Sequence, residues 1–212
     1  MGKRPKPVPQ KMPGKKGPPV REPGRTPAKR RAAAKAPAPR RIAAAEPKPG
    51  NAVQDLQREV EQLLYRQAEA LDNKQWQAFI DLFTADGVYW MPPAPHYTTW
   101  DGMPAIFAED PDLMTVRMNR IKHPHAWSQA PEWGTNHVVS NVVVESVDPG
   151  SGDVQVRSRF HMVELRRDEL RHFAGAYRHH LQRTKDGFRI KLQRVDMMNA
   201  QAPYEYVLQA WV

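Results

Sequence analysis

The feature that most constrains the fold is a strict alternation of side chains between residues 154 and 162. Successive side chains of a β-strand point to opposite faces of the sheet, so a period of two indicates a strand with one buried face. The alternation therefore predicts a half-buried strand in a sheet that turns one face to a core. The inward set is Val154, Val156, Ser158, Phe160 and Met162, and the outward set is Gln155, Arg157, Arg159 and His161.

Strand-like segments lie on both sides of this one. A Val-rich stretch at 137–147 precedes it across a Pro-Gly turn, and a period-two pattern at 173–181 follows it. Lys185-Asp186-Gly187 is a hairpin signal that leads into an apolar pattern at 188–192. The apolar parity then shifts by one residue, which predicts a β-bulge near Gln193. Short turns between these strands predict antiparallel pairing.

Helical spacing dominates the region before the sheet. Apolar residues recur on one stripe from Val53 to Leu71. A second short helix from Trp76 to Phe83 is expected to run to the turn signal Ala85-Asp86-Gly87, and Val88–Met91 reads as a strand. A third helix is expected from Asp110-Pro111 to Ile121, because proline is favoured in the first turn of a helix.

This order of elements predicts an α+β fold. Two helices, a strand, a helix and then several long strands suit a cone in which N-terminal helices pack on a strongly curved antiparallel sheet. The apolar residues Tyr206-Val207-Leu208 and Trp211-Val212 would be costly to leave in water. They are therefore expected to be buried in the sheet or in an interface.

Residues 1–50 differ sharply in composition from the rest of the chain. They hold 15 of the 32 Lys and Arg, 12 of the 21 prolines and two acids, a net charge of +13, whereas residues 51–212 carry a net charge of −4. With few apolar groups to offset the entropy of ordering, the first segment is predicted to be a disordered basic tail, or the product of a start codon assigned too far upstream. Residues 51–212 suffice for one domain. No aromatic residue interleaves with the tail's cations, so no specific nucleic-acid partner is expected.

The 212 residues include no cysteine. Disulfides, thiolate metal sites and an iron–sulfur cluster held by this chain are therefore excluded. No run approaches the roughly 18 consecutive apolar residues that a membrane span needs. A soluble, cytoplasmic protein without a membrane partner is expected.

A set of motifs in the second half of the chain resembles a known family. The motifs are Ala126-Trp127-Ser128-Gln129-Ala130-Pro131, His137-Val138-Val139-Ser140-Asn141-Val142, Phe160 with Met162, Leu165 and Arg166, Phe173-Ala174-Gly175 with Tyr177, and Gly187-Phe188-Arg189-Ile190 followed by Arg194-Val195-Asp196. Residues 53–212 resemble the β subunits of aromatic-ring-hydroxylating dioxygenases, which belong to the nuclear transport factor 2-like (NTF2-like) cone superfamily. The family often has Arg-Thr-Arg-His where this chain has Gly134-Thr135-Asn136-His137.

The resemblance implies a structural role in catabolism of an aromatic compound. It implies no cofactor in this chain, and a large (α) subunit that carries a Rieske 2Fe-2S cluster and a mononuclear Fe(II), assembled with it as a trimer of heterodimers. Electrons would come from NADH through a separate reductase, in some systems by way of a ferredoxin. The alternative is a stand-alone, cofactor-free isomerase or dehydratase of the same superfamily.

Candidate site residues differ between the two hypotheses. For a subunit, we expect Trp127 and Trp133, placed in a loop at 123–134, and also His137 and Trp211 to lie at an interface with either the large subunit or another small subunit. For an independent enzyme, the cavity candidates are Asp196, His161, His179 and Tyr177. Asp196 is expected instead to form a structural ion pair with Arg194, and Tyr177 to pack in the core. His123 and His125 flank a proline, and the neighbours His179 and His180 point to opposite strand faces, so no metal site is predicted.

Overall fold

The computed structural model describes residues 52–129, 133–202, 208 and 211–212, which all belong to a compact unit that spans Pro47–Val212. The tail of residues 1–50, Ala130-Pro131 of the family-like motif, and Tyr206-Val207 lie outside the described residues. Predictions made for those segments stay predictions. The described part of the chain includes no helix that is long and apolar enough to cross a membrane.

Three α-helices form in the described ranges where the apolar spacing predicts them. They are α1 (Ala52–Asp72), α2 (Trp76–Ile80) and α3 (Pro111–Lys122), and each buries an apolar stripe. Asp110 caps α3, because its carboxylate accepts the backbone N–H of Leu113 at 2.9 Å. The predicted start of the third helix is thus confirmed.

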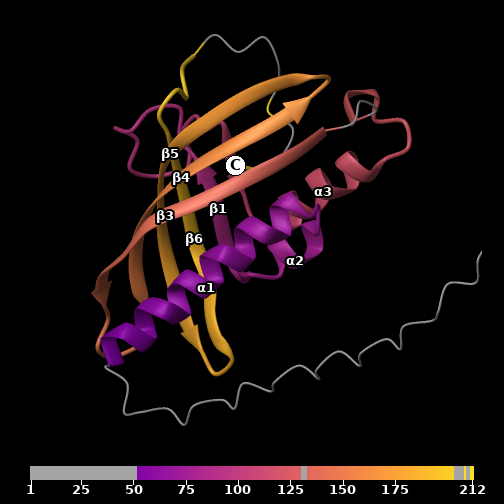
Figure 1. The fold of residues 1–212 in the computed structure, drawn as a ribbon. Helices are drawn as coiled ribbons and strands as arrows, with labels where there is room; N and C mark the ends of the chain where they lie inside the picture. Colours follow the sequence, from indigo (N-terminus) through magenta and orange to yellow (C-terminus); the bar gives the residue numbers. More distant parts are fainter. Residues whose placement is uncertain (1–51, 130–132, 203–207, 209–210) are drawn as a thin grey trace, which may run out of the picture. The chain divides into compact units, whose positions relative to one another are not determined.

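The six strands of the described residues form one curled, open sheet in the order β2-β1-β6-β5-β4-β3. Figure 1 shows α1, α2 and α3 on one side of this sheet. Adjacent strands are antiparallel except β1 and β6, which are parallel. The strands are β1 (Phe83–Met91), β2 (Phe107–Glu109), β3 (Trp133–Val147), β4 (Val154–Arg166), β5 (Glu169–Thr184) and β6 (Gly187–Met197).

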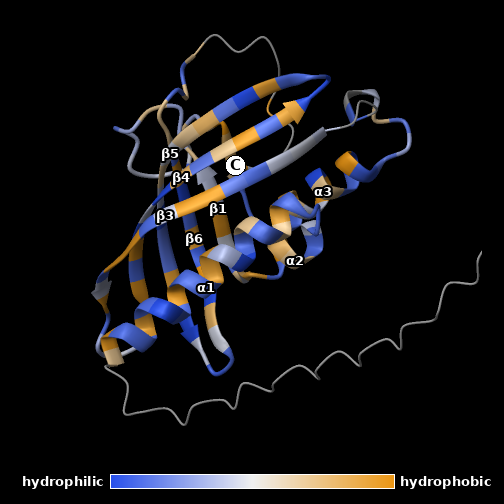
Figure 2. Cartoon of the chain, viewed as in Figure 1, coloured by the Kyte–Doolittle hydropathy of each residue, from blue (hydrophilic) through white to orange (hydrophobic). Residues whose placement is uncertain are grey.

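The alternation that begins at residue 154 lies on β4, which pairs with the edge strand β3 and with β5. The predicted inward set, Val154 to Met162 by twos, is buried on β4, and the residues between are partly or fully exposed. Figure 2 shows the same alternation as bands of apolar and polar residues along the strand. The predicted half-buried strand and α+β class are therefore confirmed.

The boundary between α2 and β1 differs from the prediction. Helix α2 ends at Ile80 and β1 begins at Phe83, so the expected turn Ala85-Asp86-Gly87 lies inside a strand. The register of β1 against β6 shifts between Phe83 and Val88, so these turn-forming residues make a bulge. Glycine is required there, because a Cβ on Gly87 would lie 2.7 Å from the carbonyl oxygen of Ile190.

The predicted bulge in β6 is present, two residues earlier than expected. The register between β5 and β6 shifts between His180 and Leu181, opposite Lys191. Beyond the shift, Gln193 points to the core, where it accepts a hydrogen bond from the side chain of Gln67 of α1.

The apolar C-terminal residues are buried in the core, one of the two expected outcomes. Trp211 and Val212 have no exposed surface. The ring of Trp211 lies 5.9 Å from that of Trp76 and 5.0 Å from that of Phe79, measured between centroids. The backbone N–H of Val212 donates to the hydroxyl of Tyr89, which donates in turn to the Val212 carbonyl, each at 3.1 Å. These contacts join the C-terminal residues to the aromatic core.

Candidate functional site

Two of the cavity candidates, Tyr177 and His179, point from β5 into the core. The ring of Tyr177 stacks on Phe160 of β4 with centroids 4.4 Å apart. His179 meets Tyr177 edge-on at 5.7 Å. Both side chains are buried, so the prediction that Tyr177 packs in the core is confirmed.

Burial makes both groups poor participants in proton transfer. Burial, with smaller effects from Tyr89 and Asp72, raises the pKa of the Tyr177 hydroxyl well above 10. Burial also lowers the pKa of His179 from 6.5 to about 3, and neither of its ring nitrogens has a hydrogen-bond partner among the described residues. A histidine with so low a pKa is a weak base at neutral pH, so it is unsuited to general-base catalysis.

The other two cavity candidates lie on the opposite face of the sheet. Asp196 pairs with Arg194 at 2.7 Å, and Arg194 also donates to the carbonyl oxygens of Pro95 and Tyr97 at 2.9 and 2.6 Å. The predicted structural ion pair is therefore confirmed, and it fastens the loop after β1. His161 is exposed on β4, with its Nε2 3.1 Å from the Nδ1 of His172. The four candidates do not converge on one site.

A hydrogen-bonded pair of Asp72 and His137, which the sequence did not predict, joins α1 to β3. The carboxylate of Asp72 accepts the Thr135 hydroxyl at 2.9 Å and the backbone N–H of His137 at 2.8 Å, and lies 2.6 Å from His137 Nδ1. Burial alone would raise the pKa of Asp72, but these hydrogen bonds outweigh it and hold the pKa below 3.8. Asp72 is the last residue of α1, where the helix dipole disfavours a negative charge. An acid at that position was the sequence signal that could have pointed to a partner for Asp72.

Three of the four candidate interface residues are buried within the fold of this chain. The side chain of His137 is 1% exposed beside Asp72. Trp133 is the first residue of β3 rather than part of the predicted loop, and its buried ring stacks on Trp76 at 6.0 Å. Trp211 is buried in the core, as described above. Their burial does not support an interface role, whereas Trp127 is 84% exposed.

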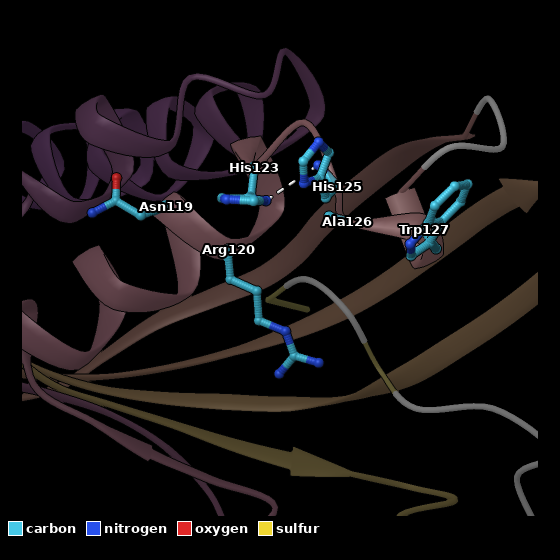
Figure 3. Close-up of a pocket in the computed structure, with 6 residues that line it drawn as sticks. All are labelled: Asn119, Arg120, His123, His125, Ala126 and Trp127. Carbon is cyan, nitrogen blue, oxygen red and sulfur yellow. Dashed lines mark hydrogen bonds between the residues drawn. The ribbon is translucent and has the colours of Figure 1, made fainter.

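Trp127 borders a surface pocket of about 540 Å³ between the end of α3 and the short 3-10 helix η1 (Trp127–Gln129). Figure 3 shows the Arg120 side chain on one side of this pocket, His123 and His125 on another, and Trp127 beyond Ala126. The lining combines a permanent cation, two imidazoles and a large aromatic ring, and it includes no carboxylate. Its residues are Asn119, Arg120, His123, His125, Ala126 and Trp127.

The two histidines of this pocket are arranged by the backbone. The N–H of His125 donates to Nδ1 of His123 at 3.1 Å, so that nitrogen is occupied within the turn. Across the described ranges, no group of three or more His, Cys, Asp or Glu side chains is placed to hold a metal ion. The pocket therefore offers a guanidinium, two imidazoles and an indole ring for binding another molecule, rather than a set of metal ligands.

Comparison with known proteins gives a consistent result. The sequence profile of the family described as "Ring hydroxylating beta subunit" matches residues 66–203. The chain is 31% identical to the chlorobenzene dioxygenase subunit beta of Cupriavidus sp., over 67% of this chain and 81% of that protein. It is 32% identical to the anthranilate 1,2-dioxygenase small subunit of Acinetobacter baylyi, over 68% of this chain and 91% of that protein.

Solved structures agree with the sequence relatives. The beta subunit of the benzoate 1,2-dioxygenase of Burkholderia mallei superposes with a TM-score of 0.56 at 27% identity, and the match covers 70% of this chain and 95% of that one. A chain of naphthalene 1,2-dioxygenase with bound indole superposes with a TM-score of 0.62 at 17% identity, over 75% and 86% of the two chains, which shows the shared fold.

Proposed function

The chain belongs to the ring-hydroxylating beta-subunit family, and from this membership we propose that it is the structural small subunit of a multicomponent dioxygenase that adds O2 to an aromatic ring. The profile match over residues 66–203 is the observation that carries the proposal. The oxidoreductase activity then belongs to the assembly, and this subunit supports the partner that performs the chemistry.

The metal centres are assigned to the large subunit. A Rieske cluster needs two cysteine ligands, and the sequence has no cysteine. A mononuclear iron site needs two histidines and a carboxylate on one face of the metal. The described residues include no group of that kind, so the large subunit would hold both the 2Fe-2S cluster and the Fe(II).

The assembly proposed is a trimer of heterodimers between this chain and a large subunit. A separate reductase would take electrons from NADH and pass them to the large subunit, in some systems through a ferredoxin. Relatives are named for chlorobenzene, anthranilate, biphenyl and benzoate, so the substrate class proposed for this system is an aromatic compound.

The stand-alone isomerase or dehydratase is not retained as a second function. Its cavity candidates lie on two faces of the sheet, and His179, the best placed inside, has a pKa of about 3. None of the four candidates is both inside the cone and suitably basic.

Co-purification tests the proposed function. An affinity tag on this chain should retain a large subunit that contains iron, and light scattering on the eluted complex should give the mass of three copies of each subunit. A chain that stays monomeric and never elutes with a dioxygenase large subunit would remove the proposal.

A further inference from the structure

Helix α3 packs one side against the core and exposes two large apolar side chains on its outward side. Met114 and Met118 point inward and are 0% and 6% exposed. On the outward side, Leu113 and Val116 are 50% and 64% exposed. A second apolar stripe on a helix is costly in water, and contiguous exposed apolar surface indicates a contact with another molecule.

The outward stripe continues into the pocket beside Trp127. Leu113, Val116 and Arg120 are spaced by three and four residues, so they share one face of α3. Arg120 lines the pocket, and Trp127 closes its far side with an 84% exposed ring. We refer to Leu113, Val116, Arg120 and Trp127, with the pocket between the last two, as the α3 surface.

The pocket end of the α3 surface is positive, whereas Asp112 is exposed near Leu113 at the other end of the helix. The guanidinium of Arg120 has no ion-pair partner among the described residues, in contrast to Arg117 on the same helix, which is held by Glu109. Lys122 is also exposed at the end of the helix. The partner that complements this surface therefore presents an apolar side chain next to a carboxylate.

We propose that the α3 surface is the docking site for the large subunit, and that it binds a segment in which an apolar or aromatic side chain stands beside an Asp or Glu. The inference rests on the proposed function and specifies the contact. Trp and Arg are the residues most enriched among those that dominate binding energy, and here they flank one pocket. A two-fold contact between copies of this chain that is centred on Arg120 would instead bring Arg120 against Arg120, which like-charge repulsion disfavours.

The test uses full-length chain and the large subunit that co-purifies with it. Trp127→Ala and Arg120→Glu should each weaken the complex by about 30-fold or more in Kd, the loss typical of a dominant contact. Val116→Asp should weaken it as well, because it places a charge in the apolar stripe. Arg159→Glu is the matched control: it reverses an exposed arginine on β4, away from α3, and should leave Kd unchanged.

Folding and identity of the partner are measured alongside affinity. All four positions are exposed, so thermal melting of the isolated variants should match wild type. If wild type binds a large subunit and the α3 variants bind it equally well, the docking site is elsewhere and the inference is wrong while the proposed function stands. If the variants lose only self-association, the occupant is a second copy and the inference is overturned. If wild type binds no large subunit, the proposed function fails and the inference fails with it.

Discussion

Trp211 donates a hydrogen bond of 3.0 Å from its indole Nε1 to the carboxylate Oε2 of Glu109, although 102 positions separate them. The same carboxylate accepts a hydrogen bond from Arg117 Nε at 2.8 Å. Glu109 ends β2 and Arg117 lies on α3, so the indole joins the C-terminal segment to the edge of the sheet and to a helix. Two donors compensate the Glu109 carboxylate for its loss of water contacts. Removing one donor would leave part of that desolvation penalty uncompensated and would lower the stability of the fold.

We predict that Trp211→Ala lowers the free energy of unfolding by about 3–5 kcal/mol, because it removes a fully buried aromatic side chain. Trp211→Phe should lose less, since packing is partly kept while the hydrogen bond to Glu109 is lost. Urea unfolding followed by circular dichroism measures both. Trp127→Ala is the control and should stay within about 0.5 kcal/mol of wild type. Equal losses at the two tryptophans would contradict the assigned positions.

Gly175 is expected to be irreplaceable on packing grounds. A Cβ there would lie 2.9 Å from the Phe160 ring and 3.0 Å from the Cα of Met197, and it would also meet the Asp196 carbonyl. Gly175→Ala should therefore cost about 3 kcal/mol through overpacking. Gly134→Ala is the matched control, because no described atom lies within 4 Å of a Cβ at that strand position. Thermal melting of both variants checks the difference, and two similar melting temperatures would disprove the close approach.

His179 should make the protein sensitive to mild acid. Its pKa is about 3 in the folded chain and about 6.5 when unfolded, so the unfolded chain binds the proton more readily. Stability should then fall as the pH drops from 6.5 toward 3, by up to about 1.4 kcal/mol per pH unit, and should not depend on this group above 6.5. His179→Leu should flatten the pH dependence of the urea midpoint, and the exposed-site variant His161→Leu should not. Parallel curves for wild type and His179→Leu would refute the burial argument.

The basic tail stays a prediction from composition. Deleting residues 1 to about 48 should leave folding and complex assembly intact, because a segment so rich in proline and charge buries little apolar surface. Differential scanning calorimetry and co-elution with the large subunit measure the two properties. A truncated chain that no longer melts cooperatively would show that the tail belongs to the fold.

Local patterns predicted most of the secondary structure. The period-two alternation at 154–162 became β4, and the Asp110-Pro111 signal became the capped start of α3. Both patterns depend only on residues that are close together in the sequence, so they can be recognised without the structure. The turn signal at 85–87 failed for the opposite reason, because its pairing partner on β6 is about a hundred residues away and converts the turn into a bulge.

Long-range contacts account for the site residues that could not be predicted. Trp133 was expected in a loop, but stacking on Trp76 draws it into the core at the start of β3. The pair between Asp72 and His137 spans 65 positions and has no local motif. Trp127 was predicted to lie at an interface, and that stays a prediction; its ring is exposed, and its place beside Arg120 at one pocket depends on the three-dimensional fold.

The most direct test of the proposed function is an assay of aromatic-ring hydroxylation with and without the large subunit. In the presence of O2, NADH and a reductase, the purified chain alone should form no product, and addition of the large subunit should produce the hydroxylated ring. Product formed by the chain alone, or a full rate from the large subunit without it, would contradict the assignment of a structural, non-catalytic subunit.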